Sequence, residues 1–165
     1  MRFKSLFIFL SLFIILSLFI PATRLSAAVF NFRQAVYPVK AEVSDCPDTP
    51  NHTLGIMSYK GIAFFDPQDV ASVTASQTID YINGSGPHLG YFTYTFSDNS
   101  TLSIKITGTT KASQGGVTVE GKATVIKGTG RFSSTKGSGT YTGKRPPKET
   151  DTELYHFFKL DITLK

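Results

Sequence analysis

The sequence has one cysteine, Cys46, and no tryptophan among its 165 residues. A single cysteine excludes an intramolecular disulfide, so the fold must be held by its hydrophobic core. Cys46 lies in the segment Asp45-Cys46-Pro47-Asp48, where we expect a small side chain in a loop. Nucleophilic catalysis and a disulfide between two chains are the alternatives, although the sequence places no base beside Cys46.

Long hydrophobic runs are absent after the first 20 residues. Leu6 to Ile20 is apolar apart from two serines, follows a basic start and ends at Pro21. With the small residues Ser26-Ala27-Ala28 behind it, this run predicts a cleaved signal peptide over residues 1–28. A retained membrane anchor is the alternative. We therefore expect a secreted or periplasmic protein whose residues 29–165 form one domain, with no linker and no internal repeat.

Acidic residues are scarce in the second half of the chain. The whole sequence has a formal net charge of +5, but three of its basic residues lie in the predicted signal peptide. Between Lys105 and Lys148 there are nine basic residues and one acid, Glu120. This segment predicts either a solvated sheet face or a surface for anionic partners, but no nucleic-acid module. The basic surface residues are Lys105, Lys122, Arg131, Lys136, Lys144 and Arg145.

The sequence has no long segment of helical period, and apolar side chains alternate instead. Candidate strands cover residues 54–65, 70–82, 117–126 and 154–164, and the alternation is clearest over residues 89–106. There, placing both apolar sets on one face requires an odd number of loop residues, and we predict that Phe96 pairs with Leu102 and Tyr94 with Ile104. Asn99 is suited to the left-handed conformation in this turn.

Seven or eight short strands joined by close turns predict an all-β fold. An antiparallel meander closed into a β-barrel of about eight strands would bury the apolar faces and remove exposed edges. A two-sheet sandwich is the alternative.

A glycine-rich corner, Gly128-Thr129-Gly130-Arg131-Phe132 followed by Gly137-Ser138-Gly139, joins two of the candidate strands. This motif resembles the GTGxF…G segment of the allene oxide cyclase-like and dirigent-like barrel superfamily, in particular its small exported bacterial members. The resemblance covers residues 89–143. It implies an eight-stranded antiparallel barrel with a cavity for apolar small molecules, often as a homo-oligomer such as a trimer or dimer. It assigns no catalytic residue here.

Histidines are few and form no metal-binding motif. His156 lies on an apolar alternating face, either as a general base or as a hydrogen-bonded core residue, and the latter is favoured. We expect His88 to be exposed in the turn Gly86-Pro87-His88-Leu89-Gly90 and His52 to lie in a loop. Because no HxH, HExxH or Cys/His pair is present, neither a metal nor a cofactor is expected. Asp66 and Asp69, which flank Pro67-Gln68, are interpreted as turn residues.

Gly121 and Ala123 leave volume among larger apolar side chains. Either a bulky neighbour such as Phe158 or a ligand fills this volume. The predicted cavity is lined by Phe92, Tyr94, Ile104, Val119, Gly121, Ala123, His156 and Phe158.

Three functions compete at this point. The first is a non-catalytic exported barrel that binds an apolar or amphipathic small molecule. The second is a dirigent- or cyclase-like enzyme acting on a hydrophobic intermediate in the barrel. The third is an interaction protein that binds anionic surfaces through its basic face. The sequence leaves open whether the chain is an enzyme.

Overall fold

The computed structural model describes residues 28–66, 68–145 and 156–164. The elements of this part are β1 (Ala28–Asp45), β2 (His52–Phe65), β3 (Asp69–Ile82), β4 (Gly86–Phe96), β5 (Thr101–Ser113), β6 (Gly116–Gly128), the 3₁₀ turn η1 (Gly130–Phe132), β7 (Gly137–Arg145) and β8 (His156–Leu164). Within the described residues, no helix is long and apolar enough to cross a membrane. The predicted signal peptide lies outside the described residues except for Ala28, where β1 begins.

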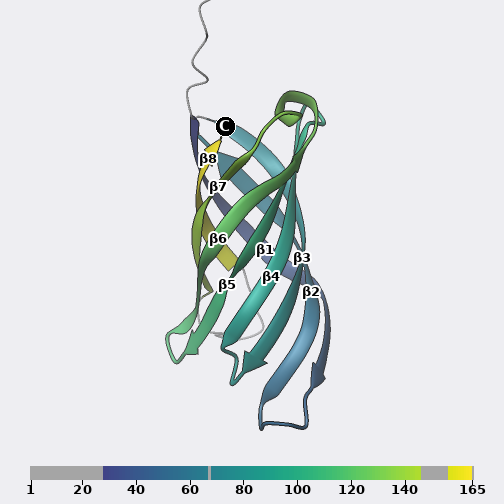
Figure 1. Cartoon of the computed structure of the whole chain (residues 1–165), viewed down its shortest axis with the longest axis vertical. Helices are drawn as coiled ribbons and strands as arrows, with labels where there is room; N and C mark the ends of the chain where they lie inside the picture. Colours follow the sequence, from purple (N-terminus) through teal and green to yellow (C-terminus); the bar gives the residue numbers. More distant parts are fainter. Residues whose placement is uncertain (1–27, 67, 146–155, 165) are drawn as a thin grey trace, which may run out of the picture.

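Each strand pairs antiparallel with the next along the chain, and β1 also pairs with β8 (Figure 1). The strand order therefore closes into a barrel. The predicted all-β antiparallel meander is confirmed, and the candidate strands at 54–65 and 70–82 coincide with β2 and β3. The strands are longer than expected, because β1 has 18 residues and β2 and β3 have 14 each.

Alternation along each strand separates the interior from the outer face. In β3, Ala71, Val73, Ala75, Gln77 and Ile79 are buried while the residues between them are exposed. A strand directs successive side chains to opposite faces, so this pattern places one row inside the barrel. The same alternation places the inward-facing residues of β4 to β7 without ambiguity, which lets the interior be assigned residue by residue.

The β4–β5 hairpin has the predicted parity but not the predicted register. Tyr94 pairs with Leu102, and Phe92 pairs with Ile104, two residues away from the expected pairing. The loop is shorter than expected, because the Phe96 N–H donates to the Ser100 carbonyl at 3.0 Å. Asp98 tightens the turn by accepting from the Ser100 N–H at 3.0 Å. Both apolar sets still face the interior, since a shift of two residues preserves the face.

The glycine-rich corner turns the chain at the end of β6. Gly130 has φ of +57°, a left-handed conformation that favours glycine. At Gly128, a Cβ atom would collide with the backbone of Phe132, so the chain can fold back only without a side chain there. This close turn directs the Phe132 ring into the core, where it lies 4.9 Å from the Phe96 ring. The corner thus closes one end of the barrel.

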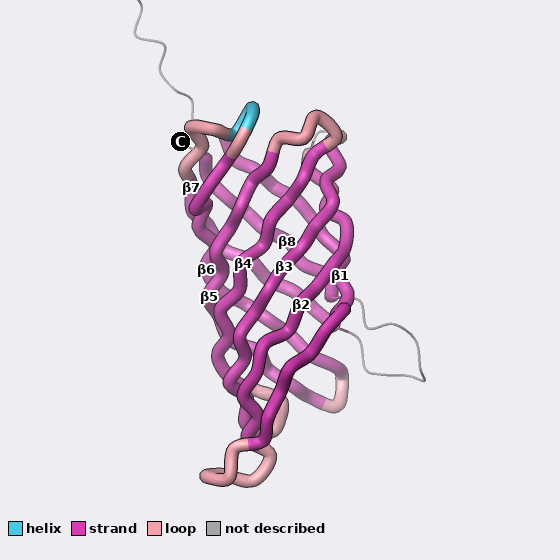
Figure 2. The backbone as a smooth tube through the Cα atoms, turned by 90° about the vertical axis from the view of Figure 1, so that its right-hand side faces the viewer, coloured by secondary structure: helices cyan, strands magenta, loops and turns pink. Residues whose placement is uncertain are grey.

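The two ends of the barrel have different contents. We call the end that carries η1 and the β2–β3 and β4–β5 turns the upper end, and the opposite end the lower end (Figures 1 and 2). At the upper end, aromatic rings from several strands pack together. Phe65 stacks on Phe32 with 4.2 Å between centroids and also contacts Phe30, Phe96 and Tyr94. At the lower end, polar side chains enter the interior.

Candidate functional site

Four polar side chains from four strands form a hydrogen-bonded chain inside the lower half of the barrel. Tyr81 of β3 bonds Thr110 of β5, with 2.6 Å between the two hydroxyl oxygens. Thr110 Oγ1 lies 2.9 Å from His88 Nδ1 of β4, and His88 Nε2 contacts the Tyr141 hydroxyl of β7. We call these residues the interior polar chain. Only 5% of His88, 4% of Thr110 and 2% of Tyr141 is exposed, whereas Tyr81 is half-buried.

Two glycines make the contact between His88 and Tyr141 feasible. The sheet register aligns His88 with Gly108, Gly108 with Gly121, and Gly121 with Tyr141. A Cβ atom on Gly121 would lie 2.7 Å from the Tyr141 hydroxyl oxygen, and one on Gly108 would also collide with it. Because neither glycine carries a side chain, the tyrosine spans the two intervening strands to reach the imidazole. The volume that the sequence indicated beside Gly121 is occupied by Tyr141.

Burial keeps the interior polar chain uncharged at neutral pH. It lowers the pKa of His88 to about 4, and it raises the pKa of Tyr81 and of Tyr141. A neutral imidazole donates from one ring nitrogen and accepts at the other. When Tyr141 donates to Nε2, Nδ1–H donates to Thr110, Thr110 donates to Tyr81, and the Tyr81 proton remains available for a ligand. With every bond reversed, Tyr81 donates to Thr110 and offers a ligand only an acceptor.

The lower half of the interior is more accessible than the upper half. Its inward-facing Met57, Tyr81, Val117 and Val119 are half-buried. By contrast, the inward-facing residues near the upper end, such as Phe96 and Leu102, are 3% and 1% exposed. Tyr81 is the member of the interior polar chain nearest to solvent. A molecule that enters the lower end would therefore meet apolar walls and the phenol of Tyr81.

Arg145 adds a positive charge to this region. It ends β7 on the same inward-facing row as Tyr141, opposite Val117 of β6, and it is half-buried. Its charge lowers the pKa of both Tyr59 and Tyr81, although burial remains the larger effect and raises both pKa values. No ion pair involves Arg145 among the described residues. A half-buried guanidinium that has no carboxylate partner within the described residues is suited to an anionic group.

Of the residues predicted to line one cavity, those whose side chains the structure describes do not lie together around one space. Phe92, Tyr94, Ile104 and Ala123 belong to the hydrophobic core and are each at most 2% exposed. The Tyr94 hydroxyl is satisfied within the barrel, because it donates to Gln34 Oε1 at 2.7 Å. Val119 is half-buried toward the lower end. In β8, the backbones of His156 and Phe158 pair with those of Val36 and Gln34 of β1. The side chains of His156 and Phe158 lie outside the described part of the structure.

Sequence reasoning missed the central residue of the site. His88 was expected to be exposed in a turn, and this prediction is wrong, because β4 begins at Gly86 and directs His88 into the interior. Pro87 and the flanking glycines indicated a turn when the segment was considered alone. The alternation His88, Gly90, Phe92, Tyr94 was the signal that could have placed this histidine on the inward face.

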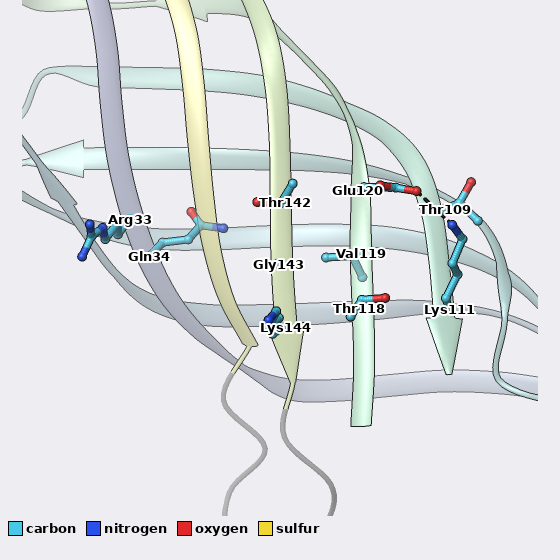
Figure 3. A pocket seen from close by; sticks show the side chains of 10 residues that line it. All are labelled: Arg33, Gln34, Thr109, Lys111, Thr118, Val119, Glu120, Thr142, Gly143 and Lys144. Atoms are coloured by element: carbon cyan, nitrogen blue, oxygen red, sulfur yellow. Dashed lines mark hydrogen bonds and ion pairs between the residues drawn. The ribbon is translucent and has the colours of Figure 1, made fainter. Parts of the chain in front are cut away.

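A separate hollow of about 590 Å³ lies on the outer face of the sheet (Figure 3). Of the ten described residues that line it, seven are exposed, namely Arg33, Thr109, Lys111, Thr118, Glu120, Thr142 and Lys144. Lys111 Nζ lies 3.1 Å from Glu120 Oε1 at its edge, so part of the positive charge is locally compensated. This hollow is on the opposite side of the barrel wall from the interior polar chain.

The predicted basic surface residues differ in their surroundings. Lys122, Lys136 and Lys144 are exposed, and Lys105 is half-buried. Arg131 instead covers the upper end, with its guanidinium carbon 4.6 Å from the Phe96 ring centroid and 4.9 Å from that of Phe132. It also pairs with Asp69 and, at 3.7 Å, with Asp98. These contacts give Arg131 a structural role at the glycine-rich corner.

No protein-family model matches the sequence, and no curated protein matches it. Among solved structures, the chain is similar to the pterocarpan synthase dirigent protein GePTS1, with a TM-score of 0.49 and 15% sequence identity. The alignment covers 83% of this chain and 88% of that chain. The match concerns the fold alone.

Proposed function

We propose that the chain is an exported eight-stranded barrel that binds an amphipathic acid in the lower half of its interior. The observation that carries this proposal is the interior polar chain, which ends at half-buried Tyr81 within reach of the charge of Arg145. The apolar body of the ligand would lie against Met57, Val117 and Val119. Its carboxylate would accept from the Arg145 guanidinium and from the Tyr81 hydroxyl.

The charges favour a monoanion over a cation or a neutral lipid. Arg145 is the only lysine or arginine on the described inward-facing rows of the lower half, and the acid on them, Asp45, is exposed at the end of β1. A cationic head group would be repelled by the guanidinium, and a neutral one would leave it without a partner. Hydrogen bonds that involve a charged group contribute about 1.5–3 kcal/mol, enough to distinguish an acid from its ester.

Fluorescence titration with a dansyl-labelled fatty acid and its methyl ester tests this proposal. We expect the acid to bind the purified protein more tightly than the ester. Arg145→Gln should weaken binding of the acid about tenfold or more and leave binding of the ester unchanged. The matched control is Lys144→Gln, which removes the same charge from the outward-facing neighbour. Equal affinity for acid and ester, or equal losses in the two variants, would contradict the proposal.

His88 supports a second candidate, a dirigent- or cyclase-like enzyme. Such an enzyme needs a polar group inside the barrel with a shifted pKa, and the lowered pKa of His88 keeps its imidazole neutral and able to accept a proton. The test is to release any small molecule that copurifies with the protein, return it to wild type and to His88→Gln, and follow its structure by mass spectrometry and NMR. Conversion by wild type alone supports catalysis, whereas recovery unchanged from both supports binding without catalysis.

A further inference from the structure

The tip of the β1–β2 hairpin gathers three side chains of metal-ligating type. Cys46, Asp48 and His52 each offer one ligand atom, and these atoms lie within 4.8 Å of one another. Cys46 and His52 are half-buried, and Asp48 is exposed. The sequence analysis predicted no metal site and found no base beside Cys46. The spacing Cys46-x-Asp48-x₃-His52 matches none of the motifs considered, and only the hairpin turn brings its two ends together.

The imidazole of His52 is held between two carboxylates, one from the β1–β2 turn and one from β3. Its Nδ1 lies 2.7 Å from Asp48 Oδ1, and its Nε2 lies 2.8 Å from Asp80 Oδ1 of β3. The side chain of His52 is 14% exposed, whereas those of Asp48 and Asp80 are 60% and 54% exposed. Because a carboxylate oxygen only accepts, Nδ1–H donates to Asp48 and Nε2–H donates to Asp80. Loss of the Nδ1 proton alone would keep the bond to Asp80 and leave a lone pair on Nδ1 for a metal. A histidine that binds a metal through one ring nitrogen usually donates the N–H of its other ring nitrogen to a carboxylate, as His52 does to Asp80.

The loop that carries these residues is fixed by hydrogen bonds outside the ligand atoms. The Cys46 N–H donates to the His52 carbonyl at 2.8 Å. Asn51 adopts a left-handed conformation with φ of 58°, and its side-chain amide donates to Asn83 Oδ1 at 2.9 Å. The Asn83 N–H in turn donates to the Asn51 carbonyl at 3.0 Å. The β1–β2 tip is therefore tied to the β3–β4 turn, next to Asp80.

We propose that Cys46 Sγ, an Asp48 carboxylate oxygen and His52 Nδ1 bind a zinc ion, with Asp80 orienting His52. Sulfur, nitrogen and oxygen donors together suit a borderline-soft ion that favours tetrahedral coordination. In such a site the ligand atoms lie about 3.5 Å apart. Side-chain rotations that move the ligand atoms by about 1 Å would therefore close the cluster around the ion. On binding, the Cys46 thiol and the His52 Nδ1–H each release a proton to solvent, and the Asp48–His52 hydrogen bond is replaced by two bonds to the metal.

Three protein ligands leave a fourth position for water or an external ligand. The site lies on the outside of the lower end, at the β1–β2 tip, and its residues are separate from the interior polar chain (Figure 1). The inference therefore does not depend on the proposed binding of an amphipathic acid. It also gives Cys46, the only thiol of the chain, a metal-bound state as an alternative to oxidation.

Titration of the untagged, reduced protein with zinc or cobalt chloride tests the site. We expect one Zn²⁺ per chain by native mass spectrometry, and a thiolate-to-metal charge-transfer band with four-coordinate visible bands when Co²⁺ is bound. Cys46→Ser should abolish the charge-transfer band, and His52→Gln should weaken Zn²⁺ binding at least a hundredfold. Asp80→Asn should weaken it about tenfold to a hundredfold without changing the stoichiometry, as expected for a positioning residue.

Two controls separate this site from adventitious binding. Asp45→Asn removes a nearby carboxylate outside the cluster, and His88→Gln removes a buried histidine elsewhere, so both variants should bind Zn²⁺ as wild type does. Circular dichroism of each variant checks that the barrel is intact. A Co²⁺ complex without the thiolate band, or equal losses in Asp45→Asn and Asp48→Asn, would overturn the proposal.

Discussion

The upper and lower halves of the barrel interior are built from the same alternating strands but filled differently. In the upper half, Phe65 and its aromatic neighbours pack ring against ring, and Phe96 joins them to Phe132 of the glycine-rich corner. In the lower half, Tyr81, Thr110, His88 and Tyr141 exchange hydrogen bonds, and the walls around them are half-buried. Close packing of apolar rings stabilises a fold, whereas a polar chain open at one end can exchange partners. Close packing therefore stabilises the upper half, and the proposed binding site lies in the lower half.

The largest effect is expected from truncating the aromatic cluster. Phe65 is 3% exposed, and replacing it with alanine should lower the free energy of unfolding by about 3–5 kcal/mol. Its neighbour Phe64 is 55% exposed on the outer face, so Phe64→Ala should change stability by less than about 0.5 kcal/mol. Urea denaturation measures both. Similar losses in the two variants would mean that the upper half is not the stabilising part of the interior.

A smaller loss of stability is expected from filling the space beside the Tyr141 side chain. Gly121→Ala would place a methyl group 2.7 Å from both the Gly108 Cα and the Tyr141 hydroxyl oxygen. Overpacking of this kind should cost about 2–3 kcal/mol and separate Tyr141 from His88. Gly115→Ala is the matched control, because its Cβ would meet nothing nearer than Ser113 Oγ at 3.8 Å. Denaturation shows the cost, and the imidazole NMR shifts of His88 show the separation. Unchanged His88 shifts in a folded Gly121→Ala protein would contradict this account of the glycines.

The sequence predicted features that depend on local period and missed those that depend on pairing across strands. The alternation of Phe92 with its neighbours is local, so the strands and their inward faces could be predicted. The contact of His88 with Tyr141 spans 53 positions and requires the full register of four strands. The β4–β5 register differs from the predicted one because Asp98 tightens the turn. The alternation of apolar residues carries no information about this side-chain hydrogen bond.

Asparagines illustrate the same division. Asn51, Asn83 and Asn99 each begin a glycosylation sequon, yet all three adopt left-handed backbone conformations, with φ of 58°, 52° and 62°. Their turn role was predictable from composition, and at Asn99 it was predicted. That Asn51 and Asn83 bond each other, and so position the proposed zinc ligands, follows only from the pairing of β2 with β3.

The smallest expected effect is a pH dependence of stability that belongs to His88 and hence to the lower half. Burial lowers its pKa to about 4, below the ordinary value of 6.5 that the unfolded chain retains. As pH falls, the unfolded chain therefore takes up the proton first, and the folded state loses stability relative to it. The contribution is complete above about pH 6.5 and is lost progressively between pH 6.5 and 4. Allowing for partial solvation, the loss is of the order of 1 to 2 kcal/mol.

Comparing His88→Gln with wild type isolates this dependence. Glutamine keeps a donor and an acceptor for Thr110 and Tyr141 but does not titrate, while carboxylates such as Asp98, whose pKa is lowered by its bonds to Ser100, remain in both proteins. Urea midpoints measured from pH 8 to pH 4 should fall more steeply for wild type, and the difference between the proteins should appear below pH 6.5. Parallel curves would show that the His88 imidazole is exposed to water. The lower half would then be a solvent-filled opening without a site for a ligand.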